Sequence, residues 1–329
     1  MSSLYSDDQL RLAARLYYLD GLSQTEVARF VKVSQAKISR LLALARTRGI
    51  VRISVEKYEP RHEALERRIC QHFGLCSTAV IKILEGATVE NARRTLGHFG
   101  SAFVSTLIPP GSVVAIAGGR TMRELVQAIP EETKSHLTVV QAMGSVDSTV
   151  GPVDAFELGH TLARRWGGSF FMLNTPAFVP DRKTRDSFLA LPQIGSVWQR
   201  LDQVSVALVG IGTLENSVFA ERGVLGAADL GQLKRRGAVG EICGRFYDSQ
   251  GRECDSPWRD RVISISLDQL RLVPQVVGIV AGADRSSAII AAIRGGLLKS
   301  LIIDEASAIA LLSADVRPAK RIGSIKMKS

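Results

Sequence analysis

Polar side chains gather over one short stretch near the start of the chain, and their types suit contact with a polyanion. Gln35, Lys37, Ser39 and Arg40 lie close together, and Arg46 follows them. Glutamine and arginine can each form two parallel hydrogen bonds to the edge of a purine base, whereas lysine and arginine also pair with phosphate oxygens. On a helix that enters the major groove, these residues predict contact with double-stranded DNA. The alternative is an amphipathic helix that turns a basic face to water.

A second set of residues could bind a small anion or a polyol. In VVAIAGGRTMREL, an apolar run is followed by Gly118, Gly119, Arg120 and Thr121 and then by a helical pattern. Glycine N–H groups, the positive end of a helix, a hydroxyl and a guanidinium together suit phosphate or polyol oxygens. The stretch is neither a G-x-G-x-x-G fingerprint nor a P-loop, so nucleotide binding is not expected. The alternative is that the glycines only permit a tight turn from strand to helix.

A similar arrangement recurs near the end of the chain. In IVAGADRSSAIIAAIRGG, Gly282 follows an apolar run, and Asp284 and Arg285 stand just before a second helical pattern. Both glycine loops therefore follow predicted strands and precede predicted helices. Ligands of open α/β sheets bind at such ends of the strands, so both loops are candidates for one binding site.

Helix signals of the N-terminal part describe how the first set of residues is positioned. Ser23 is a good N-cap and Glu26 completes a capping box, which predicts a short helix over residues 24–30. Ser34 caps a second helix that ends at Gly49. An earlier apolar helical face around residues 10–17 supplies a third helix to pack against them. The order indicates a helix-turn-helix.

Further positions fit this motif. Ala28 is small where the two helices must cross closely, and Lys32 occupies a turn position where glycine is common because the backbone tends toward positive φ. The stretch IVRISVEKY alternates like a strand and is interpreted as a β-wing. We therefore predict a winged helix-turn-helix domain over residues 1–55. The predicted DNA contacts also include the residues at the two helix starts: Gln24, Thr25 and Ser34.

The net charge is unevenly distributed along the chain. The whole chain carries +10, and residues 1–55 contain nine Lys or Arg against four acidic residues, a net charge of +5. Half of the excess therefore lies in about one sixth of the chain, which favours a polyanionic partner for the N-terminal part. Within it, Lys37, Arg46, Arg48 and Arg52 are expected at phosphates, where they fix register without reading sequence.

Length and composition restrict the class of protein. A chain of 329 residues can hold two domains. No apolar run reaches the roughly 18–20 residues that cross a bilayer, and the acidic start does not fit a secretory signal, so we expect a cytoplasmic protein that is not bound to a membrane. The four cysteines, Cys70, Cys76, Cys243 and Cys254, miss the paired spacing of structural zinc sites. No metal or cofactor is expected.

The larger part of the chain alternates apolar runs with helical segments. Residues 56–75 are interpreted as a linker and a connecting helix, and residues 76–329 as one α/β domain. Its predicted strands, among them STAVIKI, LTVVQAM, SFFML, QVSVALVGIG, RVISISL, VVGIVAG and SLIIDE, are rich in Val and Ile. Most lack polar alternation, as parallel strands covered on both faces should. This predicts a doubly wound, Rossmann-like domain that binds its ligand beyond the carboxyl ends of the strands.

The combination of these stretches resembles a known family. EVARFVKVSQAKISRLLALARTRGIVRI, PPGSVVAIAGGRT, LPQIGSVWQRLDQVSVALVGIGT, GAVGEICGRFYDSQG and AAIRGGLLKSLIIDEASAIALL follow one another as in the SorC/DeoR-type sugar-responsive transcriptional regulators of bacteria. The resemblance implies a C-terminal domain similar in fold to sugar-phosphate isomerases and deaminases. It also implies a sugar, polyol or sugar-phosphate effector, an operator on double-stranded DNA, and assembly as a homodimer or homotetramer.

By position, the resemblance assigns Gly119 and Thr121 to the anionic or hydroxyl end of the effector, with Arg120 nearby. This chain departs from the family twice. Ala117-Gly118-Gly119 replaces a common Ser-Trp-Gly, which removes a hydroxyl and an indole from the pocket. Arg285 stands where Lys is common; a guanidinium can clamp phosphate or carboxylate but cannot form a Schiff base, so covalent capture of the effector is not expected.

Three further polar residues are candidates for hydrogen bonds to effector hydroxyls: Asn174, Glu241 and Asp284. For each, a surface or capping role is the alternative.

An enzyme acting on sugar phosphates is the competing function, because the larger domain resembles that fold. Such an enzyme needs a positioned general base, often a histidine or a second carboxylate beside the glycine loop. The five histidines are scattered and none adjoins either glycine loop in sequence: His62, His72, His98, His136 and His160. The basic N-terminal part would also have no role in an enzyme, so a ligand-controlled regulator without catalytic activity is the preferred prediction.

Overall fold

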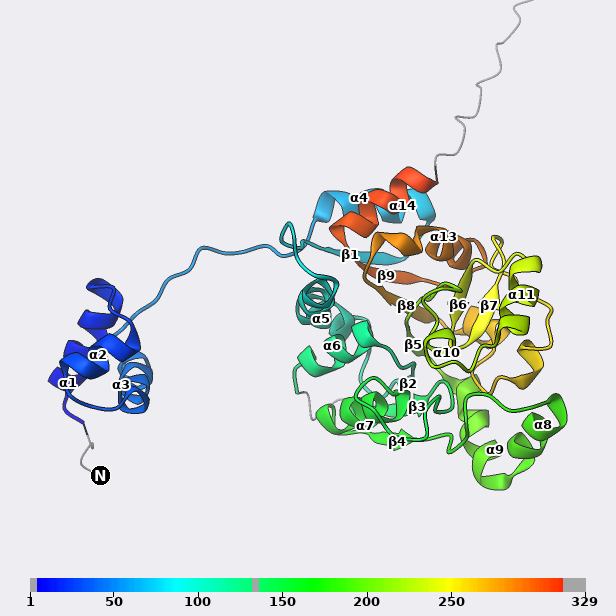
Figure 1. The fold of residues 1–329 in the computed structure, drawn as a ribbon, viewed down its shortest axis with the longest axis horizontal. Helices are drawn as coiled ribbons and strands as arrows, with labels where there is room; N and C mark the ends of the chain where they lie inside the picture. The colour runs from blue at the N-terminus through cyan, green and yellow to red at the C-terminus, as the bar shows by residue number, and fades with distance from the viewer. Residues whose placement is uncertain (1–4, 132–135, 316–329) are drawn as a thin grey trace, which may run out of the picture. The chain divides into compact units, whose positions relative to one another are not determined.

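Two units make up the chain in the computed structural model, Met1–Tyr58 and Glu59–Ser329. The structure describes residues 5–131 and 136–315. The two units are described separately below, and Figure 1 shows the elements of each.

Three helical segments with short connections form the first unit. α1 (Asp7–Ala14) continues as a π-helical turn over Arg15–Leu19, and α2 (Gln24–Phe30) and α3 (Gln35–Thr47) follow. The predicted capping box at the start of α2 is confirmed. The helices bury one apolar core, made of Leu10, Ala13, Ala14, Leu16, Val27, Ala28, Ile38, Leu41, Leu42 and Ala45.

The connections of this unit use strained or glycine backbone where they turn sharply. Lys32, between α2 and α3, has the positive φ of 53° expected for a position that usually carries glycine. Gly49 ends α3 with φ of 71°, as predicted for a C′ residue. The two predicted helices and the sharp turn between them are therefore present, and Ala28 is buried in the core that the helices share.

The predicted β-wing is wrong. Residues 50–58 form no strand, and the chain runs on as an extended segment (Figure 1). A strand requires a second strand to accept and donate its backbone hydrogen bonds. The alternation in IVRISVEKY is real, but within the described residues this segment has no strand to pair with.

A seven-stranded, all-parallel sheet forms the centre of the second unit, in the order β1-β9-β8-β5-β2-β3-β4. Its strands, in that order, are Ser77–Ile81, Ser300–Asp304, Gln275–Val280, Val206–Val209, Val113–Ile116, Thr138–Gln141 and Ser169–Phe171. The central strands are almost fully buried, which agrees with their continuous apolar sequence.

Helices cover both faces of this sheet. Successive residues of one strand belong to different cores, since Val114 and Ile116 pack on one face and Ala115 on the other. One core is shared with α5 (Val89–Thr106), α6 (Arg120–Ala128) and α7 (Ala155–Arg165). The other is shared with α4 (Glu63–Phe73), α9 (Pro192–Trp198), α10 (Val218–Glu221), α11 (Ala227–Arg235), α12 (Leu267–Leu272), α13 (Ser286–Arg294) and α14 (Glu305–Ala314). The predicted doubly wound arrangement is confirmed.

The order of the strands reverses between β2 and β5. From β2 the chain proceeds through β3 and β4 to one edge of the sheet, whereas β5 lies on the opposite side of β2 and leads to β8 and β9. The connections that leave the carboxyl ends of β2 and β5 therefore go to opposite faces. Such a reversal opens a crevice at that end of the sheet, where open α/β folds bind ligands.

The strand prediction for RVISISL is wrong. Val262 and Ser264 form only isolated bridges, to Phe178 and Met143. An unpredicted hairpin, β6 (Gly240–Ile242) and β7 (Arg245–Tyr247), lies nearby.

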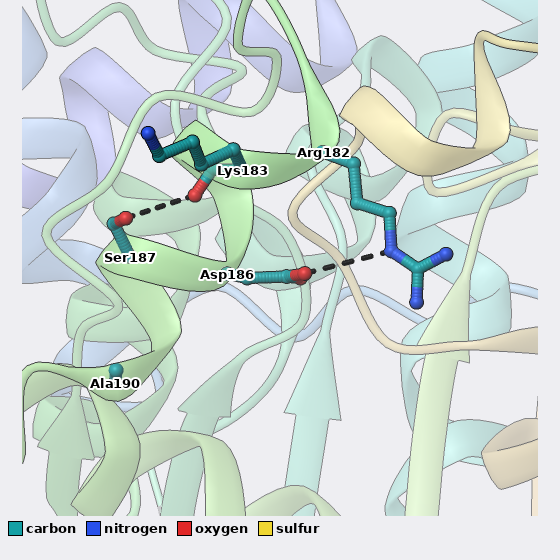
Figure 2. Close-up of a pocket in the computed structure, with 5 residues that line it drawn as sticks. All are labelled: Arg182, Lys183, Asp186, Ser187 and Ala190. Carbon is teal, nitrogen blue, oxygen red and sulfur yellow. Dashed lines mark hydrogen bonds and ion pairs between the residues drawn. The ribbon is translucent and has the colours of Figure 1, made fainter.

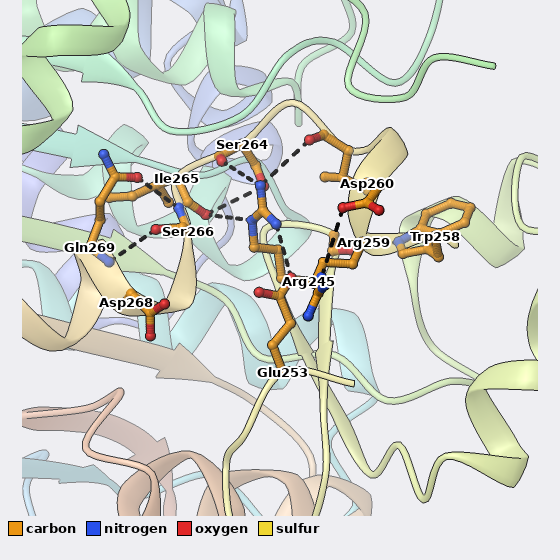
Figure 3. A network of polar contacts seen from close by, with 12 residues as sticks. Arg245, Glu253, Trp258, Arg259, Asp260, Ser264, Ile265, Ser266, Asp268 and Gln269 are labelled. Carbon is orange, nitrogen blue, oxygen red and sulfur yellow. Dashed lines mark hydrogen bonds and ion pairs between the residues drawn. The ribbon is translucent and has the colours of Figure 1, made fainter. Parts of the chain in front are cut away.

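A buried guanidinium fastens this hairpin to the RVISISL stretch. Arg245 is 6% exposed and donates to the backbone carbonyls of Val262, Ser264 and Ile265 and to the carboxylate of Glu253 (Figure 3). Each buried donor is matched by an acceptor, as a charge in a core requires. Within the described residues, no helix combines the length and the apolar character needed to span a bilayer.

Candidate functional site

The exposed face of α3 carries both long polar side chains and small residues. Polar Gln35, Ser39, Arg40 and Arg46 are all exposed, as predicted for groove contact. Small residues lie between them: Ala36 and Ala43 are exposed on the same face. Short side chains let a helix axis come close to a surface while the longer side chains reach past it.

Two of the residues expected to contact DNA also make contacts within the first unit, the head (Met1–Tyr58). The Ser34 hydroxyl caps α3 by accepting from the Lys37 N–H at 3.3 Å, and the Lys37 ammonium lies 5.4 Å from the centre of the Tyr5 ring. Thr25 is exposed and Gln24 half-buried at the start of α2. The structure thus brings all eight predicted DNA-contact residues to the starts or exposed side of α2 and α3.

The Arg48 side chain forms an ion pair within the first unit. Its guanidinium donates to the carboxylate of Asp7 at 2.7 Å and to the carbonyl of Tyr5. The pair joins the end of α3 to the start of α1. The expected phosphate contact by Arg48 would have to compete with this ion pair.

In the second unit, the first glycine loop closes tightly against the connection before α7. A side chain at Gly118 would place its first carbon 2.7 Å from the carbonyl oxygen of Val153, and the Gly119 N–H donates to that same oxygen at 2.8 Å. Gly119 has φ of 139°, a conformation open to glycine alone. Both glycines therefore have a conformational reason, and the N–H of Gly119 is already used.

The start of α6 is open beyond this loop. Gly119 is the N-cap and has no side chain to accept from the first turn. The N–H groups of Arg120, Thr121 and Met122 are left over at this end, as at any uncapped helix start, and carry its positive partial charge. Among the described residues, the Thr121 hydroxyl has no hydrogen-bond partner. These donors could receive an anionic oxygen.

The segment that follows β5 links the two glycine loops. Arg120 donates to the carboxylate of Glu221 at 2.7 Å, and the Asn216 amide donates to the carboxylate of Asp284 at 2.8 Å. β5 lies between β2 and β8 in the parallel sheet, so the loops that follow these three strands all lie at the carboxyl ends of the strands. The second predicted loop is therefore joined to the first through Glu221 and Asn216.

Arg93, on α5, interacts with the charged residues of both glycine loops, and the sequence analysis missed it. Burial, with the like charges of Arg120 and Arg285, lowers the pKa of its guanidinium, while Glu221 and Asp284 act in the opposite direction. Three guanidinium groups and two carboxylates thus act on one another here. In the sequence, Arg93 stands beside Arg94 in an ordinary amphipathic helix, so no local signal distinguishes it.

Arg285 is largely buried, with 12% of its side chain exposed. It donates to the carbonyl of Ala281 and lies 3.5 Å from the carboxylate of Asp284. Gly282, the residue before this turn, has φ of 107° and donates to the carboxylate of Asp304. The loop is thus held by hydrogen bonds to Asp304 and Ala281, and the charge of Arg285 acts on Arg93.

Glu241 is brought close to the crevice but is enclosed. Its backbone pairs with Gly212, three residues after the end of β5, and its carboxylate accepts from the Gly244 N–H and hydrogen-bonds with Ser217. Burial raises the pKa of this carboxyl group. In the structure it stabilises the β6–β7 turn against the end of β5.

Asn174 is placed differently from the other candidates. It follows β4, at the edge of the sheet, and is exposed with φ of 52°. Among the described residues its side chain makes no hydrogen bond to either glycine loop. The structure does not bring Asn174 together with the Arg93, Arg120 and Arg285 cluster.

A separate surface hollow lies on α8 (Arg182–Ala190), lined by Arg182, Lys183, Asp186, Ser187 and Ala190 (Figure 2). All five residues come from one helix that buries no side chain, and Arg182 pairs with Asp186. Specific small-molecule sites enclose most of their ligand, which this surface does not. Among the residues that the structure describes, no group of three His, Cys, Asp or Glu side chains could hold a metal ion.

The fold and these surfaces define a class. A unit of three helical segments precedes a doubly wound unit with a seven-stranded parallel sheet. Both the strand reversal of this sheet and the uncapped start of α6 lie in the second unit.

Comparison with known proteins identifies the family. The family described as "Putative sugar-binding domain" matches residues 61–313. The "Uncharacterized transcriptional regulator YjhU" of Escherichia coli K12 is 30% identical over 96% of this chain and 97% of its own length. The "Sorbitol operon regulator" of Klebsiella pneumoniae is 28% identical, with 93% and 99% covered. The crystal structure of full-length SorC from that organism superposes with a TM-score of 0.75 at 27% identity, covering 94% of this chain and 99% of that one. The chain belongs to this SorC/DeoR-type family of sugar-binding transcriptional regulators.

Proposed function

We propose that this protein is a DNA-binding transcriptional regulator whose attachment to its operator is controlled by a sugar, polyol or sugar-phosphate effector. The observation that carries the proposal is the division of labour between the units. One presents an exposed basic helix in a helix-turn-helix, and the other gathers Arg93, Arg120 and Arg285 at the switch point of a parallel sheet. The names of relatives, a sorbitol operon regulator and an erythritol catabolism regulatory protein, support a carbohydrate catabolic operon as its target.

DNA reading is assigned to α3. Gln35, Ser39 and Arg40 contact base edges in the major groove, and Arg46 contacts phosphate. Gln24, Thr25 and Ser34, at the helix starts, and Lys37 complete the contact surface. We also propose a cytoplasmic location, because the protein's proposed partners, DNA and sugar phosphates, occur there.

The effector binds at the switch point with its anionic end on the start of α6. The backbone N–H groups of the first turn and the hydroxyl of Thr121 receive its oxygens, and Gly118 and Gly119 let it come close to the backbone. Arg93, Arg120 and Arg285 together outnumber the two carboxylates that act on Arg93, Glu221 and Asp284, so this group favours an anionic effector over a neutral polyol. We therefore favour a phosphorylated effector.

The other predicted effector residues take supporting roles in this proposal. Asp284 accepts from effector hydroxyls through Oδ1, which lies 3.5 Å from the Arg285 guanidinium, while its Oδ2 accepts from Asn216. Glu241 holds the loop after β5 in position. Asn174 contacts the effector only if the loop after β4 closes over the site.

Control of DNA binding requires that the effector bind more tightly to one arrangement of the oligomer than to another. A differential affinity of about 1–3 kcal/mol is typical of such coupling. A homodimer or homotetramer presents paired heads to a palindromic or repeated operator, because half-site spacing mirrors the symmetry of the protein.

We assign no catalytic role to the larger unit. Two of its histidines have partners outside the glycine loops, since His62 lies 3.7 Å from Glu305 and His72 lies 3.2 Å from Asp315. These two histidines are thus not placed as general bases beside α6. Turnover of a sugar phosphate by the purified chain would contradict it.

The test is a thermal-shift screen of sugars, polyols and their phosphates on the full chain, followed by binding to a duplex enriched from a random library. A ligand that binds the native state raises the melting temperature by an amount set by its concentration and Kd. We expect a phosphorylated ligand to raise it most and to change affinity for the enriched duplex. If no ligand stabilises the chain and no duplex is enriched, the proposal fails.

A further inference from the structure

The segment that leaves the head has the sequence of a strand but lacks a partner. Residues 52–56 read Arg-Ile-Ser-Val-Glu, so apolar and polar side chains alternate. Ile53 is 58% exposed and Val55 82% exposed. Among the described residues, no backbone hydrogen bond is made by residues 52–56. A row of free backbone donors and acceptors beside exposed apolar side chains is a template for another strand.

Both ends of this segment are anchored. On the head side, Val51 donates its N–H to the carbonyl of Ala45 and packs against the apolar core of the head. On the other side, Arg61 forms an antiparallel bridge with Ile81, and the Pro60 carbonyl accepts from the Lys82 N–H. The unpaired segment is therefore short and bounded at both ends, and a strand of another copy can be its partner.

The sequence of this segment is complementary to itself. In an antiparallel pair of two copies centred on Ser54, Arg52 of one copy faces Glu56 of the other, and Ile53 faces Val55. The charged pairs then lie on one face of the ribbon and the four apolar side chains on the other, because side chains alternate along a strand. Opposite charges and β-branched residues directly across from each other are favourable cross-strand pairs.

We propose that residues 52–56 of two copies of this chain pair as an antiparallel β-ribbon about a two-fold axis through Ser54. The same surface serves both copies, as in any two-fold interface. The ribbon joins the ends of the two α3 helices through Gly49 and Ile50. The ribbon would fix the separation of the two α3 helices that are proposed to contact DNA. That consequence rests on the proposed function, but the pairing itself does not.

Disulfide trapping in the full chain tests the register. Cys76, which is exposed, and the half-buried Cys70 are first changed to serine. Ser54→Cys then places two thiols opposite each other at the axis. Arg52→Cys and Glu56→Cys are matched controls, because each thiol lies about four residues, or roughly 13 Å, from its own copy in this register.

We expect Ser54→Cys to form covalent dimers at least tenfold faster than either control under mild oxidation. The double variant Arg52→Cys/Glu56→Cys is expected to form dimers in which peptide mapping finds residue 52 joined to residue 56. Equal rates for the three single variants, or no dimer from Ser54→Cys, would overturn the proposal.

Charge reversal tests the pairing independently of thiol geometry. In the Ser54→Cys chain, Arg52→Glu and Glu56→Arg each place like charges opposite each other, although they change the net charge in opposite directions. We expect both to slow trapping at least fivefold and the double reversal Arg52→Glu/Glu56→Arg to restore it to within twofold. A double reversal no faster than the singles would contradict the ribbon.

Retention of the enriched duplex is measured in parallel to separate the two proposals. A chain that retains the duplex but is not trapped at residue 54 contradicts only the ribbon. A chain that is trapped there and retains no duplex supports the ribbon and contradicts the proposed function.

Discussion

Two helix starts, one in each unit, are both proposed to meet an anion, yet they are built differently. α3 begins with Ser34, whose hydroxyl accepts from the Lys37 N–H at 3.3 Å. α6 begins with Gly119, which has no side chain to offer. One N–H at the start of α3 is therefore satisfied by the side chain of Ser34, and contact with phosphate is proposed to come from the long side chains beyond it. The start of α6 is left for an acceptor from outside the chain.

The other helices of the second unit make this difference meaningful. α5, α7 and α14 are capped by the side chains of Thr88, Asp154 and Asp304. α13, which begins at the second glycine loop, has no side-chain cap. α9 and α11 also lack one, but neither directly follows a strand of the sheet. Within the described sheet-to-helix connections, missing caps thus occur at the two glycine loops.

The largest effect is expected from the cluster beside the open helix start. Arg93→Ala removes one of three guanidinium groups at the site and should weaken a phosphorylated effector by about 2–3 kcal/mol, or roughly 30- to 150-fold. Calorimetric titration with the ligand found by screening measures it. DNA affinity without effector should not change.

Arg94→Ala is the matched control, because that side chain is 62% exposed and pairs with Glu90 on the same helix. The effector Kd of this variant should stay within about twofold of the unsubstituted chain, as is usual for an exposed helix pair. Equal losses in the two variants would mean that Arg93 acts only through the general charge of the surface.

The next effect concerns the hydroxyl at the same helix start. Thr121→Ala removes a hydroxyl that has no hydrogen-bond partner among the described residues. The only hydrogen bond that the substitution should remove is therefore the one proposed to the effector. A hydrogen bond to a charged group contributes about 1.5–3 kcal/mol, so the effector response of DNA binding should be lost at concentrations that saturate the unsubstituted chain. Thr121→Ser should restore it. A fully responsive Thr121→Ala chain would show that the effector binds elsewhere.

The features that the sequence predicted correctly are those that depend on residues close together along the chain. Ser23, Ser34 and Gly49 act within a few residues, so their patterns located the helices of the head correctly. Continuous apolar runs likewise identified the parallel strands, because burial on both faces leaves a local trace. Lys32 was recognised as a strained turn for the same reason.

Other features depend on partners far along the chain. The predicted β-wing was wrong because an alternating sequence indicates that a strand is possible but does not indicate which strand would pair with it. Arg93 was missed because it meets Arg120 and Arg285 only after three distant segments fold to one edge. Glu241 was predicted by position, but its enclosure by Gly212 and Gly244 depends on a hairpin that no local pattern indicated.

A smaller effect tests the closed helix start as a reader of DNA. Arg40→Ala removes an exposed guanidinium from α3 and should cost about 1–2 kcal/mol at one base position while relaxing preference there. Competition among single-base variants of the enriched duplex measures it. Arg46→Ala, proposed to contact phosphate, should instead weaken all variants alike. Unchanged discrimination in Arg40→Ala would refute its role at a base edge.

The smallest effect separates a helix start that is complete by itself from one that awaits a ligand. Ser34→Ala removes the cap of α3 and should cost about 1 kcal/mol, which speeds hydrogen exchange of the first α3 amides roughly fivefold. Ser39→Ala, on the same helix but away from its cap, should leave exchange unchanged. Saturating effector should slow the amides of Arg120, Thr121 and Met122 but should not reverse the Ser34→Ala loss. Equal protection of both helix starts by the effector would mean that α3 and α6 do not differ in the way their caps indicate.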